Sequence, residues 1–327
     1  MSERLPLLYI LSSGRSGSTL LDLLMGAHPN LWSVGELQIL PWELEEHRAP
    51  CGCGQHLNVC SFWNGVLKGL DESGIDLEAG PLPLRHFRNA HGFGQVLRKD
   101  HLRSLWRGRL TESQASLARS YGQLNRSVLD AVARHAAPLR PAGIQWLVDA
   151  SKDPYRLAHL AASDQFDLRV VHLVKDPRAF VHSMTRADER LEKSRVMRFG
   201  LRWGVENRLM RRYLERGLAP EQWRAVRYED LAGDPAGTLS ELFSWLGVEP
   251  DFPAHEAFRE ADNHAVSGNQ MRWQSGGVRL DQKWRAQLPG WAQAAAWNLS
   301  APVRAGLGFG HDPVGQLAEA GGQRSAA

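Results

Sequence analysis

Short apolar runs bounded by glycine, proline or charged residues recur along the chain and predict buried strands. The first run covers residues 5–13 and leads into a glycine, and residues 19–27 then follow a helical pattern. A strand, a glycine loop and a helix in this order begin a parallel α/β unit. Three later runs are rich in β-branched or aromatic residues and predict further buried strands: Ile144–Val148, Leu168–Val174 and Trp223–Tyr228.

A turn or helix signal follows each of these three later runs. The first run is followed by Asp-Ala-Ser-Lys-Asp-Pro, which begins at Asp149, and the second by Lys-Asp-Pro-Arg, which begins at Lys175. The third run is followed by two carboxylates, the first of which is Glu229. Ligands of open α/β sheets bind beyond the carboxyl ends of such strands, so these turns and the glycine loop are expected to converge. The pattern predicts an α/β fold with a central parallel sheet flanked by helices.

The domain prediction is a single unit over residues 1–312. Residues 95–136 are mostly helical in pattern, and they belong to a mostly helical and loop-like insertion expected at about 40–140. The segment 262–290 is loop-like, with several glycines and basic residues. The last residues, 313–327, are rich in glycine and alanine and are predicted to be disordered.

Composition and charge narrow the class of protein. The 327 residues are 43% hydrophobic and 23% charged, which is ordinary for a globular protein, and the net charge of +3 gives no argument for nucleic-acid or general membrane binding. The first apolar run is too short for a signal peptide, and no run reaches the length of a membrane span. A cytoplasmic protein is therefore expected.

The glycine loop is the first candidate for chemistry. It reads Ser-Ser-Gly14-Arg15-Ser16-Gly17-Ser18-Thr19, and backbone N–H groups at a helix N-terminus can bind an anion there. A plain turn with Ser18 and Thr19 as helix caps is the alternative, but it leaves Arg15 at the tip unexplained. The loop lacks the Gly-Lys-[Ser/Thr] ending of a Walker A motif, which weakens a nucleoside-triphosphate interpretation.

Together with later segments, this loop resembles the PAPS-dependent sulfotransferases, in particular the tyrosylprotein and Golgi carbohydrate branches and their bacterial relatives (PAPS is 3′-phosphoadenosine 5′-phosphosulfate). In that family such a loop holds the 5′-phosphosulfate. Residues 171–186 resemble the family segment in which a basic residue and a serine eight positions later hold the 3′-phosphate. Lys175 and Ser183 occupy these two positions, although the family usually has arginine at the first. Arg178 and Arg186 are candidate helpers or parts of a solvated helix face.

The resemblance also implies catalytic residues. Ser151-Lys152-Asp153-Pro154 is similar to the Asn-Lys-Asp-Pro element of tyrosylprotein sulfotransferases, in which the lysine neutralises charge on the transferring group. Gly35-Glu36 is similar to the element that supplies the family's general base, a role that suits a carboxylate. Arg15, Lys152 and Glu36 are thus the expected catalytic residues; a surface or helix-start glutamate is the alternative for Glu36.

Two further elements follow in family order. Tyr228, in Arg-Tyr-Glu-Asp-Leu, would contact the nucleotide, or is a core tyrosine at a strand end. Ser267, Gly268 and Asn269 resemble the late loop that closes over the nucleotide. The implied fold is P-loop-type and three-layered, and the implied reaction is in-line sulfuryl transfer from PAPS to a hydroxyl acceptor, with PAP (3′-phosphoadenosine 5′-phosphate) as product and no metal required.

Other interpretations and partners stay open at this point. A P-loop kinase or NTPase is the main alternative, and a nucleotide-binding module without catalysis is the second. The acceptor is expected to be a hydroxyl of a small molecule, glycan, lipid or peptide, and the insertion at 40–140 would shape its site. No nucleic-acid partner and no membrane span are expected, and a homodimer stays open. Trp32, Trp42 and Trp63 could line an acceptor groove or lie in the core.

The three cysteines, Cys51, Cys53 and Cys60, fall within ten residues of one another. Their odd number argues against a disulfide framework in a cytoplasmic chain. A metal site with His47 or His56 as fourth ligand is one interpretation. The spacing matches no common zinc pattern, so a tight turn with small buried thiols is favoured and no metal ligand is assigned.

Overall fold

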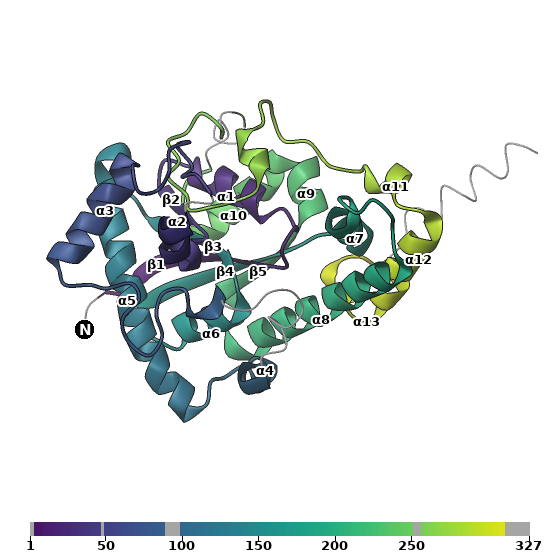
Figure 1. Cartoon of the computed structure of the whole chain (residues 1–327), viewed down its shortest axis with the longest axis horizontal. Helices are drawn as coiled ribbons and strands as arrows, with labels where there is room; N and C mark the ends of the chain where they lie inside the picture. The colour runs from purple at the N-terminus through teal and green to yellow at the C-terminus, as the bar shows by residue number, and fades with distance from the viewer. Residues whose placement is uncertain (1–2, 47–48, 89–98, 251–255, 257, 311–327) are drawn as a thin grey trace, which may run out of the picture.

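The protein, seen here as a computed structural model, is described over residues 3–46, 49–88, 99–250, 256 and 258–310 (Figure 1). The strands within these residues form one sheet with the order β2-β3-β1-β4-β5, and every neighbouring pair is parallel. The strands are β1 Leu5–Ser12, β2 Leu31–Gly35, β3 Trp146–Lys152, β4 Phe166–Val174 and β5 Trp223–Arg227. The predicted parallel α/β sheet is confirmed.

Helices connect the strands and extend the fold beyond β5. The α-helices are α1 Ser18–Gly26, α2 Leu40–Glu46, α3 Ser61–Glu72, α4 Lys99–Arg107, α5 Glu112–Ala136, α6 Pro154–Ala161, α7 Pro177–Thr185, α8 Lys193–Gly217, α9 Tyr228–Gly233, α10 Pro235–Leu246, α11 Trp284–Gln287, α12 Gly290–Leu299 and α13 Ala301–Arg304. The 3₁₀ turns are η1 Leu37–Ile39, η2 His86–Arg88, η4 Ala137–Leu139, η5 Pro220–Gln222, η7 Gln270–Trp273 and η8 Ala305–Leu307. The helical stretch expected at 95–136 corresponds to α4 and α5, with 95–98 outside the described residues.

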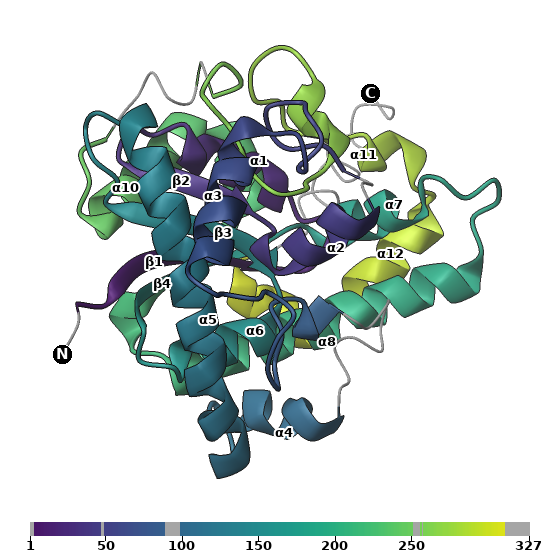
Figure 2. The ribbon, with the colours of Figure 1, turned by 60° about the vertical axis from the view of Figure 1, so that its left-hand side comes forward.

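The alternation of side chains along β1 explains the layers. Leu7, Tyr9 and Leu11 point into a core shared with α3, α5, α6 and α8, whereas Leu8 and Ile10 point into a core shared with α1, α9 and α10. Figures 1 and 2 show the sheet between these two sets of helices. Because both faces are covered, the strands are apolar on both sides, and the predicted three-layer fold is confirmed.

Two strands pass into helices through the same short sequence, Lys-Asp-Pro. Asp153 and Asp176 are the N-caps of α6 and α7, and the proline that follows each aspartate starts the helix at a position where no N–H is needed. These turns place Lys152 and Lys175 at the carboxyl edge of the sheet. Strand β3 is longer than predicted, because the residues expected to form a turn after Val148 still pair with β1 as far as Lys152.

At the periphery of the sheet, two of the three tryptophans near Glu36 in sequence lie in the core. Trp32 and Trp63 are 1% and 0% exposed and belong to the core, so the groove-wall alternative is wrong for these two side chains. Helices α3 and α5 pack on each other and contribute to the core on one face of the sheet. The expected tail at 313–327 lies outside the described residues. Among the described helices, none has both the length and the apolar character that crossing a bilayer demands.

Candidate functional site

A cavity of about 780 Å³ lies at the carboxyl edge of the sheet. Its size falls in the range of small-molecule and cofactor sites. The loop after β1, the ends of β2, β3, β4 and β5, helix α7 and the late segment 268–283 all contribute to its wall. The convergence expected from the strand ends is therefore present in the fold.

Most of the predicted site residues line this cavity. They are Gly14, Arg15, Gly17, Ser18, Thr19, Glu36, Lys152, Lys175, Ser183, Tyr228, Gly268 and Asn269. Among the described residues, the predicted Ser16 and Ser267 are not part of the lining; Ser16 is 1% exposed and lies beneath the loop surface. The residues brought together come from segments as far apart in sequence as positions 14 and 269.

The glycine loop turns tightly between β1 and α1. Gly17 is the N-cap of α1 with φ of 94°, and no side chain caps the helix, so the alternative in which Ser18 or Thr19 serves as cap is wrong. Arg15 is held at φ 72°, a left-handed conformation that costs free energy for a residue with a Cβ atom. The N-terminus of α1 has no side-chain cap, and Gly17, Ser18 and Thr19 line the cavity, an arrangement that suits an anion site.

Replacing Gly17 tests how closely this loop packs on Tyr228. A Cβ atom at position 17 would lie 2.4 Å from Cδ2 of Tyr228, and the positive φ adds strain. We expect Gly17→Ala to lower the free energy of unfolding by at least about 1 kcal/mol, measured by chemical denaturation. Gly14→Ala is the matched control, because a Cβ at Gly14 meets nothing within 4 Å and its φ is not positive. Equal stability of the two variants would contradict this packing.

The second part of the site is an ion pair between β2 and β3. Lys152 Nζ donates to Glu36 Oε1 at 2.5 Å, and the two side chains are 19% and 13% exposed. Lys152 has φ of 67°, so this residue too is held in the left-handed region. Strained conformations of this kind persist only where the surroundings determine them, and they cluster at functional sites.

The surroundings that hold Lys152 are a set of buried polar contacts. Asp149 accepts from the Ser151 backbone N–H at 2.9 Å, and Gln38 Nε2 donates to the Ser151 carbonyl at 2.9 Å. Arg156, fully buried, donates to Asp149 Oδ2 at 2.6 Å. Removing either partner of such a buried pair leaves an uncompensated charge, so this network holds the strand end firmly in place.

Glu36 is positioned by the late segment of the chain. Its backbone N–H donates to the Val266 carbonyl at 2.8 Å, and the Val266 N–H donates to the Val34 carbonyl at 3.0 Å. A Cβ atom at Gly35 would lie 2.5 Å from the Val266 carbonyl oxygen, and Gly35 has φ of 67°. Glycine is therefore required before Glu36 for the late segment to approach β2 so closely.

A buried carboxyl group supports β2 from below. Ser33 Oγ donates to Asp22 Oδ1 at 2.5 Å and accepts from the Gly35 N–H at 3.0 Å. Burial raises the pKa of Asp22 to about 7, although the hydrogen bond from Ser33 and the charge of Lys152 act in the opposite direction. Through the Ser33 hydroxyl, Asp22 connects α1, which follows the glycine loop, to Gly35, the residue just before Glu36.

The raised pKa of Asp22 predicts a pH dependence of stability. The folded protein binds this proton more tightly than the unfolded chain, so the stability that Asp22 contributes is complete below about pH 4 and is lost as pH rises through about 7. Between pH 5 and pH 8 this decrease amounts to at most about 2.5 kcal/mol, and we expect Asp22→Asn to remove it, measured as unfolding free energies at the two pH values. The exposed Asp71→Asn is the control. An unchanged difference between the two pH values in Asp22→Asn would contradict the assignment.

Lys175 and Ser183 form the third part of the site. Lys175 is 7% exposed, and its Nζ lies 4.1 Å from the centroid of the Tyr228 ring. The Tyr228 hydroxyl accepts from the Asp281 backbone N–H at 3.3 Å, so the ring joins the glycine loop, Lys175 and the late segment. Tyr228 is both buried at a strand end and part of the cavity wall. Ser183 faces the same cavity from α7.

The charges of the site favour an anion. Burial and the charge of Arg186 lower the pKa of Arg15. Burial lowers the pKa of Lys175; the charges of Asp281 and Glu229 act against this change, and those of Arg186 and Arg15 act with it. The cavity is lined by the cations Arg15, Lys152, Lys175, Arg186, Arg259, Arg279 and Lys283 and by the carboxylates Glu36 and Asp281. A polyanionic ligand would relieve the repulsion among these cations.

Two candidate helpers have different roles. Arg186 lines the cavity. Arg178 is 2% exposed, pairs with Asp176 Oδ2 at 2.7 Å and stacks on Trp284 and Trp297, so both alternatives considered for it, helper and solvated face, are wrong. Its charge is neutralised within the fold, and its planar group fills space between aromatic rings.

Part of the cavity wall has no counterpart among the predicted site residues. It consists of Arg259 and most of the segment Met271–Lys283. The sequence signal for this segment is weak, namely glycines with Arg272, Arg279 and Lys283 in a loop-like stretch. Arg272 anchors the segment by donating to the Pro50 carbonyl at 2.6 Å and to the Ser267 carbonyl.

The cysteine region also departs from what its sequence predicts. Cys53 is exposed rather than buried, whereas Cys51 and Cys60 are buried. Among the described residues, the histidine that lies against the thiols is His264, from the late segment, and not His56. His47 lies outside the described residues. A histidine about two hundred positions away could not be assigned from local spacing.

Comparison with known proteins identifies the family. The model described as "Sulfotransferase family" matches residues 82–253. Carbohydrate sulfotransferase 5 of Mus musculus is 24% identical over 335 residues, which cover 88% of this chain and 76% of that protein. Carbohydrate sulfotransferase 3 of Rattus norvegicus is 29% identical over 182 residues, but these cover only 47% of this chain and 36% of that protein.

Solved structures agree on the architecture. The sulfotransferase domain of the Synechococcus PCC 7002 olefin synthase has 26% identity and a TM-score of 0.52, with 95% of this chain and 98% of that chain covered. The sulfotransferase domain from the curacin biosynthetic pathway has 20% identity and a TM-score of 0.51, with 92% and 99% covered. The second of these likenesses bears on the fold alone.

Proposed function

Because the chain belongs to the sulfotransferase family, we propose that it transfers a sulfuryl group from PAPS to a hydroxyl acceptor. The family resemblance noted in the sequence is confirmed, and the protein is a transferase of the sulfotransferase type. The observation that carries the proposal is the cavity in which the glycine loop, the Lys152–Glu36 pair and Lys175 with Ser183 meet.

The residues present fit the chemistry of PAPS. A 5′-phosphosulfate would lie on the loop from Gly14 to Thr19, where helix N–H groups and Arg15 provide donors. The 3′-phosphate would be held by Lys175 and Ser183. In the described part of the chain, the buried hydroxyl groups of Ser12 and Ser13 have no hydrogen-bond partner, which leaves donors for bound water or ligand beneath the loop.

The chain's own residues divide the reaction among them. Glu36 takes the proton of the acceptor hydroxyl while the oxygen of that hydroxyl forms a bond to sulfur. The bond between sulfur and the bridging oxygen breaks on the opposite side, and the nucleotide phosphate leaves with the electron pair. Arg15 and Lys152 offset charge on the sulfuryl oxygens and the leaving oxygen. The 2.5 Å contact of Lys152 with Glu36 supports a shared role, because it places base and cation in direct contact.

The carbohydrate sulfotransferase relatives favour a glycan hydroxyl as the acceptor. We propose that the region 40–140 shapes the acceptor site. A cytoplasmic location and a homodimer are further predictions. Transfer from labelled PAPS to sugar, phenol, lipid head-group and tyrosine-peptide hydroxyls would identify the acceptor class. Labelling of a phenol but no sugar would contradict the glycan assignment while leaving sulfuryl transfer intact.

Nucleotide binding separates the proposal from the kinase or NTPase alternative. Calorimetric titration should give micromolar or tighter binding of PAP without magnesium and much weaker binding of ATP. The reasons are the loop without a Walker A lysine and the second phosphate site at Lys175. Tight, magnesium-dependent ATP binding with no response to PAP would overturn the proposal.

A further inference from the structure

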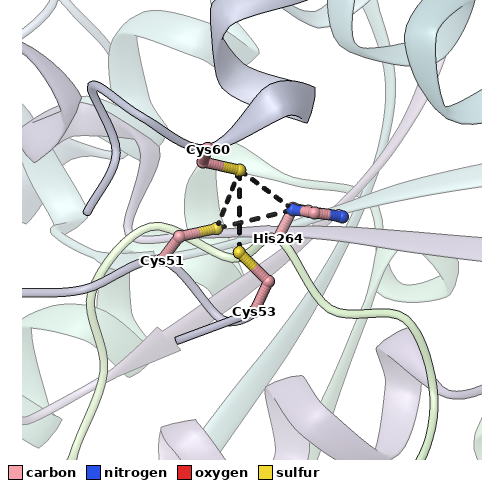
Figure 3. A group of neighbouring side chains, drawn as sticks. All are labelled: Cys51, Cys53, Cys60 and His264. Carbon is pink, nitrogen blue, oxygen red and sulfur yellow. Dashed lines mark hydrogen bonds between the residues drawn. The ribbon is translucent and has the colours of Figure 1, made fainter. Parts of the chain in front are cut away.

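Three cysteines and one histidine meet at a point where two distant segments of the chain touch. Cys51 and Cys53 belong to the turn before α3, Cys60 is the N-cap of α3, and His264 comes from the late segment (Figure 3). The Cys60 sulfur lies 3.6 Å from that of Cys51, 3.7 Å from that of Cys53 and 3.2 Å from Nδ1 of His264. The distance from the Cys51 sulfur to the same nitrogen is 3.6 Å.

These distances are those of a tetrahedral metal site. With Zn–S of about 2.3 Å and Zn–N of about 2.0–2.1 Å, tetrahedral angles place two sulfurs about 3.8 Å apart and a sulfur and a nitrogen about 3.6 Å apart. The four donor atoms all lie within 4.8 Å of one another, so one ion can contact them all. Figure 3 shows the four side chains pointing toward a common centre, with Nδ1 of His264 turned to the sulfurs.

The backbone around the cluster is already arranged. The Cys51 N–H donates to the Gln55 carbonyl at 2.7 Å, and the Gly54 N–H donates to the Cys51 carbonyl at 2.9 Å, which closes a tight turn. Gly54 has φ of 87°, as such a turn requires. The Cys60 thiol lies at a helix N-terminus, where the helix dipole stabilises a thiolate.

The histidine is fixed independently of the thiols. Its ring stacks on Phe62 at 4.7 Å between centroids, and Trp63 Nε1 donates to the His264 carbonyl at 2.7 Å. Both aromatic residues belong to the first turn of α3, directly after Cys60. The segment that carries Cys60 therefore also holds the imidazole in place, which reduces the ordering that metal binding would require.

We propose that Cys51, Cys53, Cys60 and His264 bind one Zn²⁺ ion in a closed structural site. Three thiolates with one imidazole form a soft donor set that selects zinc over hard cations, and four protein ligands leave no position for a substrate. None of the four is among the described residues that line the anion cavity. Cys53 is exposed and gives the ion a path of entry.

The ion ties the turn before α3 to the segment that holds Glu36. The Gly52 N–H donates to the Ala265 carbonyl at 3.0 Å, and the Val266 carbonyl accepts from the Glu36 N–H at 2.8 Å. His264 is thus two residues from the position that braces β2 and four residues from Gly268 in the cavity wall. Loss of the ion is expected to loosen residues 263–269.

The first test measures metal content. Untagged protein, purified with reductant and without chelator, is expected to contain about one zinc per chain by mass spectrometry of the metals. Cys53→Ser and His264→Gln should each lower this at least fivefold after dialysis against a weak chelator. His56→Gln is the matched control, because His56 lies in the same turn but outside the cluster, and its zinc content should stay within about 20% of wild type.

The second test uses cobalt and hydrogen exchange. Titration of reduced, metal-free protein with Co²⁺ should end at one equivalent, with the intense thiolate-to-cobalt absorption of a tetrahedral site. Removal of the ion should increase amide exchange in the peptide covering 263–269 and leave α5 unchanged. Neither readout depends on PAPS or on turnover.

Three results would overturn the proposal. The first is reduced wild-type protein that binds neither zinc nor cobalt at one equivalent. The second is a Cys51–Cys60 disulfide that forms in protein purified without metal and without oxidant, if that protein also takes up no metal after the disulfide is reduced. The third is loss of zinc in His56→Gln with full retention in His264→Gln, which would move the fourth ligand away from the late segment.

Discussion

Glu36→Gln is expected to lower kcat for sulfuryl transfer by roughly 10²–10⁴-fold while the dissociation constant for PAP stays within about threefold of wild type. In the wild-type protein, Lys152 Nζ lies 2.5 Å from Glu36 Oε1. The substitution removes the proton acceptor but keeps an amide oxygen that can accept this hydrogen bond. The backbone position is secured by the hydrogen bond from the Glu36 N–H to the Val266 carbonyl. Steady-state kinetics with labelled PAPS and calorimetry with PAP measure the two effects separately.

Asp281→Asn is the matched control for this experiment. Asp281 is the other carboxylate among the described residues of the cavity wall, and it accepts from the Lys283 backbone N–H at 3.1 Å. Its amide variant should keep kcat within about threefold, because an asparagine oxygen can still accept this hydrogen bond. A Glu36→Gln enzyme with near-wild-type kcat would show that another group takes the proton. A loss of PAP binding equal to the loss of kcat would show that Glu36 acts in binding.

Local signals explain why much of the fold could be predicted from the sequence. The run before Gly14 is apolar because β1 has a core on both faces, and the Lys-Asp-Pro sequences at 152 and 175 combine a strand end, an N-cap and a first helical proline. Each of these signals acts within a few residues. The parallel sheet and the convergence of Lys152, Lys175 and the glycine loop follow from such signals together with the rule that parallel strands share a carboxyl edge.

Contacts between distant segments explain why other parts could not be predicted. Strand β2 spans only Leu31–Gly35, and it pairs with β3, where Leu31 lies opposite Trp146 more than one hundred residues later. The wall formed by Met271–Lys283 depends on Arg272, which reaches the Pro50 carbonyl more than two hundred residues away. The neighbour of the three thiols, His264, is equally remote in sequence. None of these pairings leaves a mark in a local window of the sequence.

The proposed second phosphate site, at Lys175 and Ser183, is the feature that would distinguish a PAPS enzyme from other phosphate-loop proteins, and a substitution of Lys175 tests it. The ammonium group is 7% exposed, lies over the Tyr228 ring at 4.1 Å and lines the same cavity as Ser183. A buried cation of this kind forms charge-assisted hydrogen bonds worth about 1.5–3 kcal/mol each. Lys175→Ala is therefore expected to raise the dissociation constant for PAP by roughly 10–100-fold.

The same variant should change binding of AMP, which lacks the 3′-phosphate, by less than about threefold, because the glycine loop is untouched. Comparing two ligands on two proteins isolates the 3′-phosphate from any general effect of the substitution. Lys175→Arg should restore most of the difference between PAP and AMP, and Lys283→Ala, which removes another cation of the cavity wall, should leave that difference intact. If Lys175→Ala weakened both nucleotides equally, Lys175 would act on the common part of the ligand or on the fold. The glycine loop would then be a phosphate site without the second anchor that a PAPS enzyme requires.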